Sequence, residues 1–419
     1  MVFPVVVMMG QRLFRLGLLF VTITLLWFGC WVSPGLALTE EQKLFNEAWR
    51  IVNRAYVDST FHHQDWSAVR QKALQHPLKN REETYLAIQQ MLASLNDPFT
   101  RLLRPDQYRS LQTSTSGELT GVGLQIASDA KTGELVVIAP IAGSPAEQAG
   151  IGPADRILKI DGMPTANLTL DEAAERMRGM IGSQVTLTLL RRTGEQVEVR
   201  LTRNRIALNP VTTELHTEAG NLPIGYIRLS QFNGNATIEL ARAIKTLEKQ
   251  GAQAYILDLR NNPGGLLQAG IEIARFWVDE GTIVYTVNRQ GIQDSFEATG
   301  QALTQAPLVV LVNQGTASAS EILAGALQDS GRAKLVGEKT FGKGLIQSLF
   351  ELSDGSGLAV TVAKYETPNH RDINQMGIMP DQVVSLEPIA REQIGTAEDR
   401  QYQAAVEVLT HQMVLAGAT

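Results

Sequence analysis

The pattern of apolar residues divides the chain into segments with different periodicities. From Thr39 to about Leu111, apolar residues recur at the spacing of one helix face, and Pro77, Pro98 and Pro105 interrupt the pattern. The apolar positions are Leu44, Trp49, Val52 and Tyr56, followed by Tyr85, Ile88, Met91, Leu92 and Leu95. This segment is therefore predicted to form a helical N-terminal domain over residues 38–116.

Short runs of alternating apolar and polar residues, typical of β-strands, begin at Gly117. Thr169 and Glu172 match the S/T-x-x-E capping box and predict a helix that extends through Arg178. The predicted strands are Gly121–Ala127, Glu134–Ile138, Arg156–Ile160, Val185–Leu190 and Val197–Leu201. These elements are expected to form one compact module over residues 117–204.

Apolar strands alternate with helical segments after Asn209-Pro210, which predicts an α/β core built from βα units over residues 205–390. The predicted strands are Ile224–Leu229, Ala254–Leu259, Leu308–Val312, Lys334–Val336 and Leu358–Ala363, and the predicted helices include Ala236–Lys249 and Glu321–Gln328. An amphipathic helix, Thr396–Leu415, is predicted within residues 391–419. The fold class expected for the whole chain is multidomain α+β.

The first 37 residues read as a secretory signal peptide. Arg12 and Arg15 precede the apolar run Leu16–Val32, and a break with small residues follows, so cleavage is expected after Ala37. The alternative is an uncleaved membrane anchor, because the run is about long enough to span a bilayer. Cleavage would export the protein and remove Cys30, which is the only cysteine.

Composition excludes several classes of function. The 419 residues carry 37 Lys and Arg against 43 Asp and Glu, a net charge of −6. With no basic excess to bind phosphate backbones, nucleic acid is not an expected partner. A single cysteine rules out an intrachain disulfide framework, a CxxC redox pair and a cysteine-rich zinc site.

The sequence lacks the common nucleophile and metal signatures. It contains neither G-x-S-x-G nor H-E-x-x-H, and no histidine lies near a serine-plus-acid motif. The histidines are His62, His63, His76, His216, His370 and His411. The segment Gly337–Gly344 approaches a P-loop, but Gly344 stands where a magnesium-binding hydroxyl is required and a strand is expected to follow. Nucleotide binding is therefore excluded.

Three segments could instead carry hydroxyl chemistry. The strand Leu308–Val312 leads into a turn of small residues that places Ser318 and Ser320 at the start of a helix, where backbone N–H groups favour negative charge. Either serine is a candidate nucleophile or simply a helix N-cap. A second turn, Asn262-Pro263-Gly264-Gly265, could supply an oxyanion donor or be only a tight turn. Lys343 is a candidate base if burial lowers its pKa, or a surface lysine.

Taken together, these segments resemble the carboxyl-terminal processing peptidases, also called tail-specific proteases. The resemblance rests on A-S-A-S-E-I at Ala317–Ile322, on Leu327-Gln328-Asp329 and on Phe341–Gly344 with Gln347 following. It extends to Asp97–Arg101, Ile224–Arg228, Leu257–Gly265 and Gly377–Asp381. The family consists of serine enzymes with a Ser/Lys dyad on a crotonase-like α/β core, and no cofactor or metal is implied.

The resemblance also implies a role for each matching residue. Ser318 corresponds to the nucleophile, Lys343 to the general base, Gln347 to a residue that orients the lysine, and Ala319 and Gly264 to the oxyanion donors. Gly265 is nearly as good a match as Gly264, and Asp329 matches a supporting acidic position.

The module from Gly117 to Arg203 is similar to a PDZ domain, with the helix after Thr169 as one wall of a peptide groove. Its segment Gly150–Gly162 matches the family's G-D-x-I pattern, except that Ala154 occupies the glycine position. By the same resemblance, the loop that binds a substrate C-terminus comprises Gly121, Val122, Gly123, Leu124 and Gln125.

Within the family, the segments Leu38–Trp49, Arg101–Pro105 and Ser116–Gly123 look most like the photosynthetic branch. That resemblance implies trimming of a photosystem II reaction-centre precursor, in a thylakoid lumen or periplasm, and is compatible with a membrane-associated substrate. Two alternatives are a PDZ adaptor or chaperone with an inactive protease core, and an acyl-CoA enzyme of the related crotonase-like core. An intact Ser318, Lys343 and Gln347 argues against the adaptor, and the peptide-binding module argues against the acyl-CoA enzyme.

Overall fold

The computed structural model of the chain describes residues 38–129, 132–166, 168–218, 222–291, 293–385, 387 and 389–417. The predicted signal peptide, its cleavage site after Ala37 and Cys30 lie outside the described residues. Within the described ranges, no helix is both long enough and apolar enough to cross a membrane.

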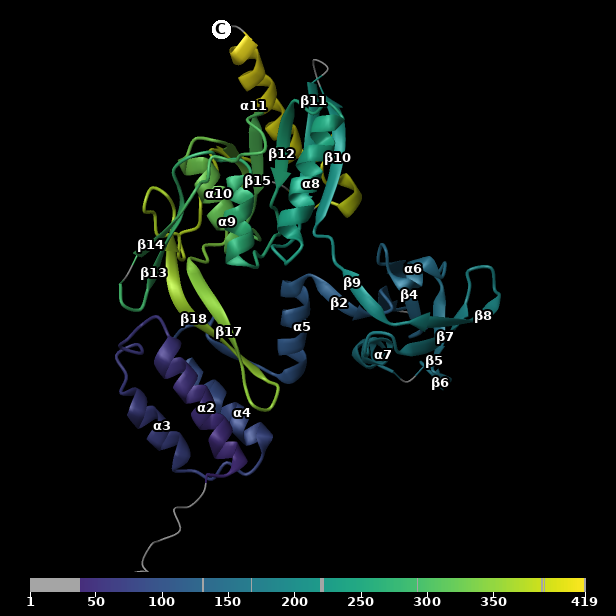
Figure 1. Ribbon diagram of the computed structural model, residues 1–419, viewed down its shortest axis with the longest axis vertical. Helices are drawn as coiled ribbons and strands as arrows, with labels where there is room; N and C mark the ends of the chain where they lie inside the picture. The colour runs from purple at the N-terminus through teal and green to yellow at the C-terminus, as the bar shows by residue number, and fades with distance from the viewer. Residues whose placement is uncertain are drawn as a thin grey trace, which may run out of the picture.

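The N-terminal part of the chain is helical, as predicted (Figure 1). Its helices are α2 (Glu40–Ala55), α3 (Trp66–Leu74), α4 (Arg81–Ala93) and α5 (Pro105–Ser116), with the short strand β1 (Arg101–Leu103) between the last two. The side chains of Thr39, Asp65 and Asn80 cap the first three helices. Phe45 and Ile88 are buried in a cluster that also contains Leu358 and Val360 from a distant hairpin, so this part shares its hydrophobic core with the rest of the molecule.

The second unit is a small antiparallel sheet with two helices, at the right in Figure 1. Its strands are β3 (Leu124–Ser128), β4 (Leu135–Pro140), β5 (Arg156–Ile160), β6 (Met163–Pro164), β7 (Gln184–Leu190) and β8 (Gln196–Thr202), and its helices are α6 (Pro145–Gln148) and α7 (Leu170–Met177). Thr169 caps α7 and Glu172 completes the predicted capping box. Ala154 has a φ of +67°, a conformation that favours the glycine expected there.

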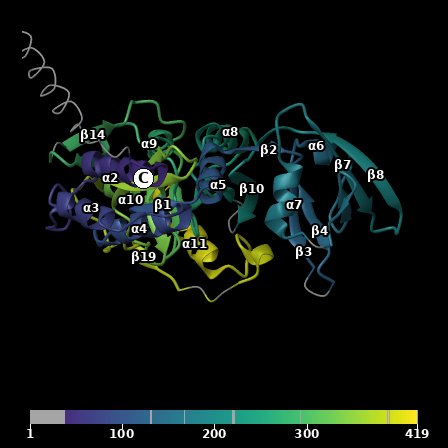
Figure 2. The same ribbon diagram turned by 90° about the horizontal axis from the view of Figure 1, so that it is seen from below.

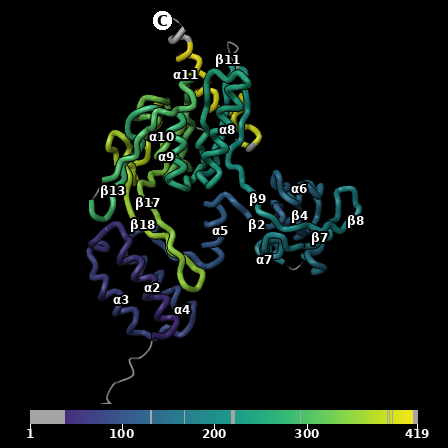
Figure 3. Tube along the Cα trace, in the orientation of Figure 1, coloured from purple at the N-terminus to yellow at the C-terminus, as the bar shows by residue number. Residues whose placement is uncertain are grey.

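A two-stranded ribbon connects this unit to the core. Strands β2 (Glu118–Gly121) and β9 (Asn204–Ala207) pair antiparallel, so the chain enters and leaves the unit side by side (Figure 3). The predicted limits of the domains, at residues 116, 204 and 390, stay predictions.

The core is an α/β unit around a six-stranded sheet of order β10-β11-β12-β15-β16-β19. Its strands are β10 (Val211–Glu218), β11 (Leu222–Leu229), β12 (Ala254–Asp258), β15 (Leu308–Val312), β16 (Lys334–Gly337) and β19 (Gln382–Val383), all parallel except β10. One face packs against α8 (Ala236–Lys249), α9 (Leu267–Arg275) and α10 (Ala319–Asp329). The other face packs against α11 (Arg400–Gly417), as Figure 2 shows from below.

A second sheet joins the core to the N-terminal helices. Strand β18 (Gly357–Glu366) pairs with β1, with β13 (Thr282–Asn288) and with β17 (Leu345–Glu351), and β14 (Gln293–Glu297) pairs with β13. The strand β17 follows Gly337–Gly344 directly. A P-loop requires a helix at this point, so Gly337–Gly344 does not have the structure of a P-loop.

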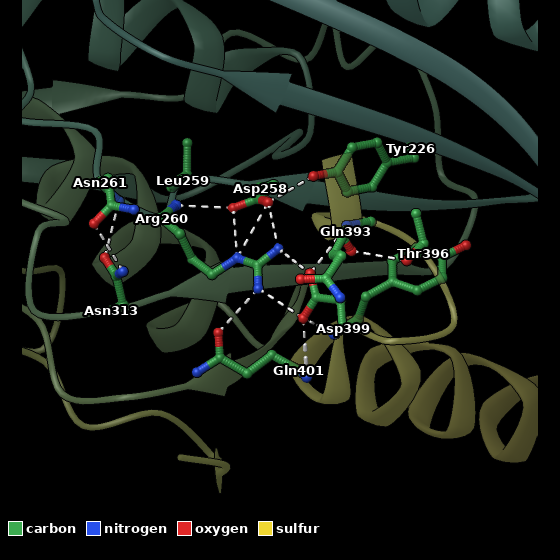
Figure 4. Close-up of polar contacts among 12 residues, drawn as sticks. Tyr226, Asp258, Leu259, Arg260, Asn261, Asn313, Gln393, Thr396, Asp399 and Gln401 are labelled. Atoms are coloured by element: carbon green, nitrogen blue, oxygen red, sulfur yellow. Dashed lines mark hydrogen bonds and ion pairs between the residues drawn. The ribbon is translucent and has the colours of Figure 1, made fainter. Parts of the chain in front are cut away.

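Buried charges attach α11 to the carboxyl end of β12 (Figure 4). The Arg260 guanidinium donates to Asp258 at 2.6 Å and to Asp399 at 2.7 Å, and Gln401 accepts a further hydrogen bond from it. The Tyr226 hydroxyl donates a hydrogen bond to Asp258 at 2.6 Å. Because Asp399 also accepts from the N–H groups of Gln401 and its neighbour, α11 begins at residue 400, four residues later than predicted.

Candidate active site

Two neighbouring parallel strands, β12 and β15, bring the predicted oxyanion turn and the predicted nucleophile turn together. Asp258 pairs with Leu311, so the loops that follow both strands leave the sheet at the same edge. Asn313 accepts from the N–H of Asn261 at 2.8 Å and donates to its side chain at 3.0 Å (Figure 4). The N–H of Ala317 donates to the Asn262 carbonyl at 3.0 Å. These bonds fix the two turns against each other.

The two candidate serines lie in different environments. Ser320 is fully buried and donates to the Asn262 carbonyl at 3.0 Å, which is a structural role. Ser318 is only half-buried, and its φ of +59° and ψ of −119° are rare for a residue with a side chain. Such strained backbone is found mainly at functional sites. The geometry therefore favours Ser318 over Ser320 as the nucleophile.

Gly264 lies directly beside Ser318. A Cβ atom on Gly264 would lie 2.6 Å from the Ala317 carbonyl oxygen and 2.9 Å from both the Ala319 nitrogen and the Ser318 Cβ, so no side chain fits there. The N–H of Ala319 has no acceptor within the described part of the chain, whereas the N–H of Gly264 donates to the Asn262 side chain at 2.9 Å. Substrate must therefore share or displace that bond if Gly264 is an oxyanion donor.

Gly265, the alternative to Gly264, faces another part of the structure. A Cβ atom there would lie 2.2 Å from the Phe232 carbonyl oxygen. The N–H of Leu266 donates to the same carbonyl at 2.7 Å. Gly265 thus allows close packing of two backbones, and Gly264 is the better placed of the two for catalysis.

Glu321, to which the sequence reasoning gave no role, links the two halves of the predicted dyad. Its side chain is fully buried, and one carboxylate oxygen accepts from the N–H of Ser318 and the N–H of Lys343, both at 2.9 Å. The other oxygen accepts from the Thr340 hydroxyl at 2.6 Å and the Gly342 N–H at 2.7 Å. The spacing of Ser318 and Glu321, which is that of a capping box, was the available signal.

Lys343 lies at the junction between the core and the N-terminal helices. Its side chain is half-buried, with Nζ 5.1 Å from the centroid of the Phe99 ring. Burial lowers the pKa of Lys343, and the nearby positive charge of Arg101 lowers it further, against the opposing effect of Asp97 and Glu321. A lowered pKa increases the fraction of neutral amine, which is the form that accepts a proton.

Gln347 was predicted to orient Lys343, but its recorded side-chain contact lies elsewhere. Its Nε2 donates to Thr361 Oγ1 at 3.4 Å, and that hydroxyl donates to Asp97 at 2.7 Å. Asp97 also accepts from the Phe99 N–H at 2.9 Å. These bonds connect Gln347 to the segment that carries Phe99, and its orienting role stays a prediction.

Asp329 lies at the far end of α10. It accepts from the Asn369 N–H at 3.0 Å and from the Arg371 guanidinium. This agrees with a supporting rather than a chemical role.

The predicted peptide-binding loop belongs to the second unit, whereas Ser318 precedes α10 in the core; Figure 1 shows that unit apart from α10. Strand β3, which contains Leu124 and Gln125, is at the edge of its sheet and can pair with an added strand. The Val122 carbonyl accepts from the N–H of Ala146 in α6, and the Gly123 carbonyl accepts from the N–H of Ile141 in the preceding loop. The N–H groups of Val122 and Gly123 have no acceptor among the described residues. Gly121 pairs with Asn204 at the end of the β2–β9 ribbon. Free N–H groups beside an edge strand suit a peptide carboxylate.

No cofactor or metal was expected, and the described residues contain no group of three or more His, Cys, Asp or Glu side chains that could hold a metal ion.

Comparisons with known protein families identify the class of protein to which the chain belongs. Residues 223–384 match Peptidase family S41, residues 136–191 match the PDZ domain, and residues 38–93 match the Tricorn protease C1 domain. The fold is therefore that of a serine peptidase with a PDZ domain, as the resemblance implied.

Relatives with high sequence identity define the family. The chain is 62% identical to the carboxyl-terminal-processing protease of Picosynechococcus sp. PCC 7002, over 92% of this chain and 93% of that protein. It is 51% identical to carboxyl-terminal-processing peptidase 2, chloroplastic, of Arabidopsis thaliana, over 83% of this chain and 70% of that protein. The solved photosystem II D1 C-terminal processing protease matches with a TM-score of 0.54 and 45% identity, over 83% of this chain and 94% of that one. The chain belongs to the carboxyl-terminal-processing protease family.

The first prediction concerns Glu321. In the Glu321→Gln variant, an amide NH₂ group would face two of the four donors that the carboxylate now accepts from. We expect kcat/KM for peptide cleavage to fall about a hundredfold, because small displacements of reacting groups cost that much. Glu338→Gln, the same change on a nearby half-buried glutamate, is the control and should keep full activity. Equal activity of the two variants would contradict the role given to Glu321.

The second prediction concerns the pH profile. Because the neutral form of Lys343 is the predicted base, activity should rise with pH through its lowered pKa. Arg101→Gln removes a neighbouring positive charge, so the pKa of Lys343 should increase and the acid limb of kcat/KM should shift to higher pH. Arg200→Gln, on an exposed arginine of β8, should leave the limb unchanged. A shift to lower pH in the Arg101 variant would refute this electrostatic account.

Proposed function

We propose that the protein is a Ser/Lys endopeptidase in which Ser318 is the nucleophile and Lys343 the general base. The observation that carries this proposal is the Glu321 carboxylate, which binds the backbone N–H groups of both residues. It explains how a serine and a lysine 25 positions apart in the sequence are held at one site.

The reaction follows from the groups present. Ser318 Oγ attacks the substrate carbonyl carbon while neutral Lys343 Nζ accepts the hydroxyl proton. The N–H groups of Ala319 and Gly264 stabilise the oxyanion. The lysine ammonium then donates its proton to the leaving amine, and the C–N bond breaks to give an acyl-enzyme. Water, deprotonated by the same lysine, hydrolyses the ester and restores Ser318.

Substrate selection is assigned to the PDZ unit. The N–H groups of Val122 and Gly123 bind the terminal carboxylate, and the following residues of β3 pair with the peptide backbone. The wall opposite β3 is α7, from which Ala173 and Met177 pack into the core of the unit.

The substrate proposed is the C-terminal extension of the photosystem II D1 precursor, and the compartment proposed is the thylakoid lumen or periplasm. The support is the name of the 45% identical solved protease and the chloroplastic relatives. An exported enzyme is also what the predicted signal peptide implies. A D1 precursor would be a membrane-associated substrate.

The third prediction tests the dyad. Ser318→Ala and Lys343→Ala should each abolish cleavage of a D1-type C-terminal peptide, followed by mass spectrometry, while circular dichroism shows an unchanged fold. Ser320→Ala is the matched control and should retain most activity, because Ser320 only donates to a backbone carbonyl. Activity that survives in Ser318→Ala but not in Ser320→Ala would move the nucleophile to Ser320.

The fourth prediction tests recognition of the C-terminus. Amidation of the peptide's terminal carboxylate removes its charge, and charge-assisted hydrogen bonds are worth about 1.5 to 3 kcal/mol. We expect kcat/KM to fall roughly tenfold to a hundredfold relative to the free acid. The two peptides differ in one group only, so equal rates would mean that the PDZ loop does not bind the carboxylate.

A further inference from the structure

Tyr365 is a buried titratable residue that the proposed reaction does not use. It lies on β18, is 1% exposed, and belongs to the main hydrophobic cluster of the core. Its backbone N–H donates to the carbonyl of Gly344, the residue after Lys343, at 3.1 Å. Its hydroxyl donates to the carbonyl of Ser318, also at 3.1 Å. Tyr365 therefore contacts the loop that carries the predicted base with its backbone, and the residue of the predicted nucleophile with its side chain.

The hydroxyl of Tyr365 keeps its proton in this position. Burial raises the pKa of Tyr365, and the negative charges of Glu321 and Asp372 raise it further. The bond to Ser318 requires the neutral form, because a phenolate has no proton to donate to a carbonyl oxygen. Among the described residues, the hydroxyl has no other hydrogen-bond partner. Its one interaction is therefore with the backbone of the predicted nucleophile.

The Ser318 carbonyl accepts hydrogen bonds from three donors. Two are backbone N–H groups in the first turn of α10, those of Glu321 at 2.8 Å and Ile322 at 3.0 Å. The third is the Tyr365 hydroxyl, which comes from a different sheet. The helix bonds direct the carbonyl along the axis of α10. The bond from Tyr365 connects it in addition to β18, and so to the strand that contacts the loop of the predicted base.

The orientation of this carbonyl also sets the direction of the Ala319 N–H, the predicted oxyanion donor. Both groups belong to one planar trans peptide unit, so the N–H points away from the C=O. The ψ angle of Ser318, −119°, determines how this unit is turned, and its backbone conformation is rarely populated unless surrounding contacts stabilise it. Hydrogen bonds accepted by the carbonyl also polarise the peptide unit, which strengthens its N–H as a donor.

We propose that Tyr365 is a positioning residue for the oxyanion site. Its hydroxyl holds the peptide unit between Ser318 and Ala319 so that the Ala319 N–H points at the substrate carbonyl oxygen, and it takes no part in proton transfer. The proposal rests on the proposed function, because it assigns a role within the same peptidase site. The bond from Tyr365 contributes most in the transition state, where negative charge develops on the substrate oxygen.

The test is Tyr365→Phe, which removes the hydroxyl and keeps the buried ring. Complete removal of an oxyanion donor costs roughly a hundredfold to a thousandfold in kcat. Because the Ala319 N–H is still present in the variant, we expect a smaller loss, a fall of about tenfold in kcat for a D1-type peptide, with KM unchanged. The acid limb of kcat/KM should stay at the same pH, because the substitution removes no charge near Lys343.

Tyr85→Phe is the matched control. Tyr85 is also buried, at 5% exposure, and its hydroxyl donates to Asp354 at 2.7 Å in the N-terminal part of the molecule. This variant loses a buried tyrosine hydroxyl and its hydrogen bond, as Tyr365→Phe does, but away from the oxyanion site. It should keep the wild-type kcat.

A second measurement separates the direction of the N–H group from effects on folding or on substrate binding. A peptide aldehyde forms a tetrahedral adduct with a serine hydroxyl, and the adduct oxygen occupies the oxyanion site. The matching peptide alcohol contains no carbonyl and cannot form this adduct. In Tyr365→Phe, the inhibition constant of the aldehyde should increase about tenfold, in parallel with the fall in kcat, while that of the alcohol stays unchanged.

The outcomes separate the two proposals. If Tyr365→Phe keeps the wild-type kcat, weakens binding of aldehyde and alcohol equally, or shifts the acid limb, the positioning role is refuted and the peptidase assignment stands. An equal loss of kcat in Tyr85→Phe would also refute it. If wild type cleaves no peptide, or Ser318→Ala still cleaves, the proposed function fails, and the role of Tyr365 fails with it.

Discussion

The carboxylate of Glu321 is the interaction on which the arrangement of the site depends. A fully buried carboxylate is costly unless hydrogen-bond donors surround it, and here four donors do so. Two of them are the N–H groups of Ser318, in the turn between β15 and α10, and of Lys343, in the loop between β16 and β17. The free-energy cost of leaving those donors unsatisfied therefore keeps the nucleophile turn and the lysine loop together. A residue that takes no part in the chemistry fixes the geometry that the chemistry requires.

The N-terminal helices are part of this site and not a separate appendage. Strand β1 pairs with β18, and the helical cluster buries Leu358 and Val360 from that same strand. This packing places the Phe99 ring under the Lys343 amine and brings the charge of Arg101 close enough to lower the pKa of that amine. Desolvation and a neighbouring cation both favour the neutral form of Lys343, so the lowered pKa of the proposed base depends partly on a segment that precedes it by more than two hundred residues.

Recognition and cleavage are assigned to separate units joined by the β2–β9 ribbon. The PDZ unit has its own core, and its edge strand β3 offers unpaired backbone groups to a peptide. The core supplies the serine and the lysine. Because the units are separate, the PDZ unit can bind the terminal carboxylate while the core binds the residues near the cleaved bond.

The sequence by itself determined the periodic elements and the chemistry-bearing residue types, because both depend on local patterns. The strands at Leu308–Val312 and Ala254–Asp258, the capped helix after Thr169, and the small-residue turns around Ser318 and Gly264 follow from such patterns. Only the tertiary structure placed Gly264 beside Ser318 and Gly265 against Phe232, brought Gln347 to Thr361, and surrounded the Glu321 carboxylate with donors. Those outcomes depend on contacts between distant segments, which the pairing of strands and the burial of charge create and which no local spacing encodes.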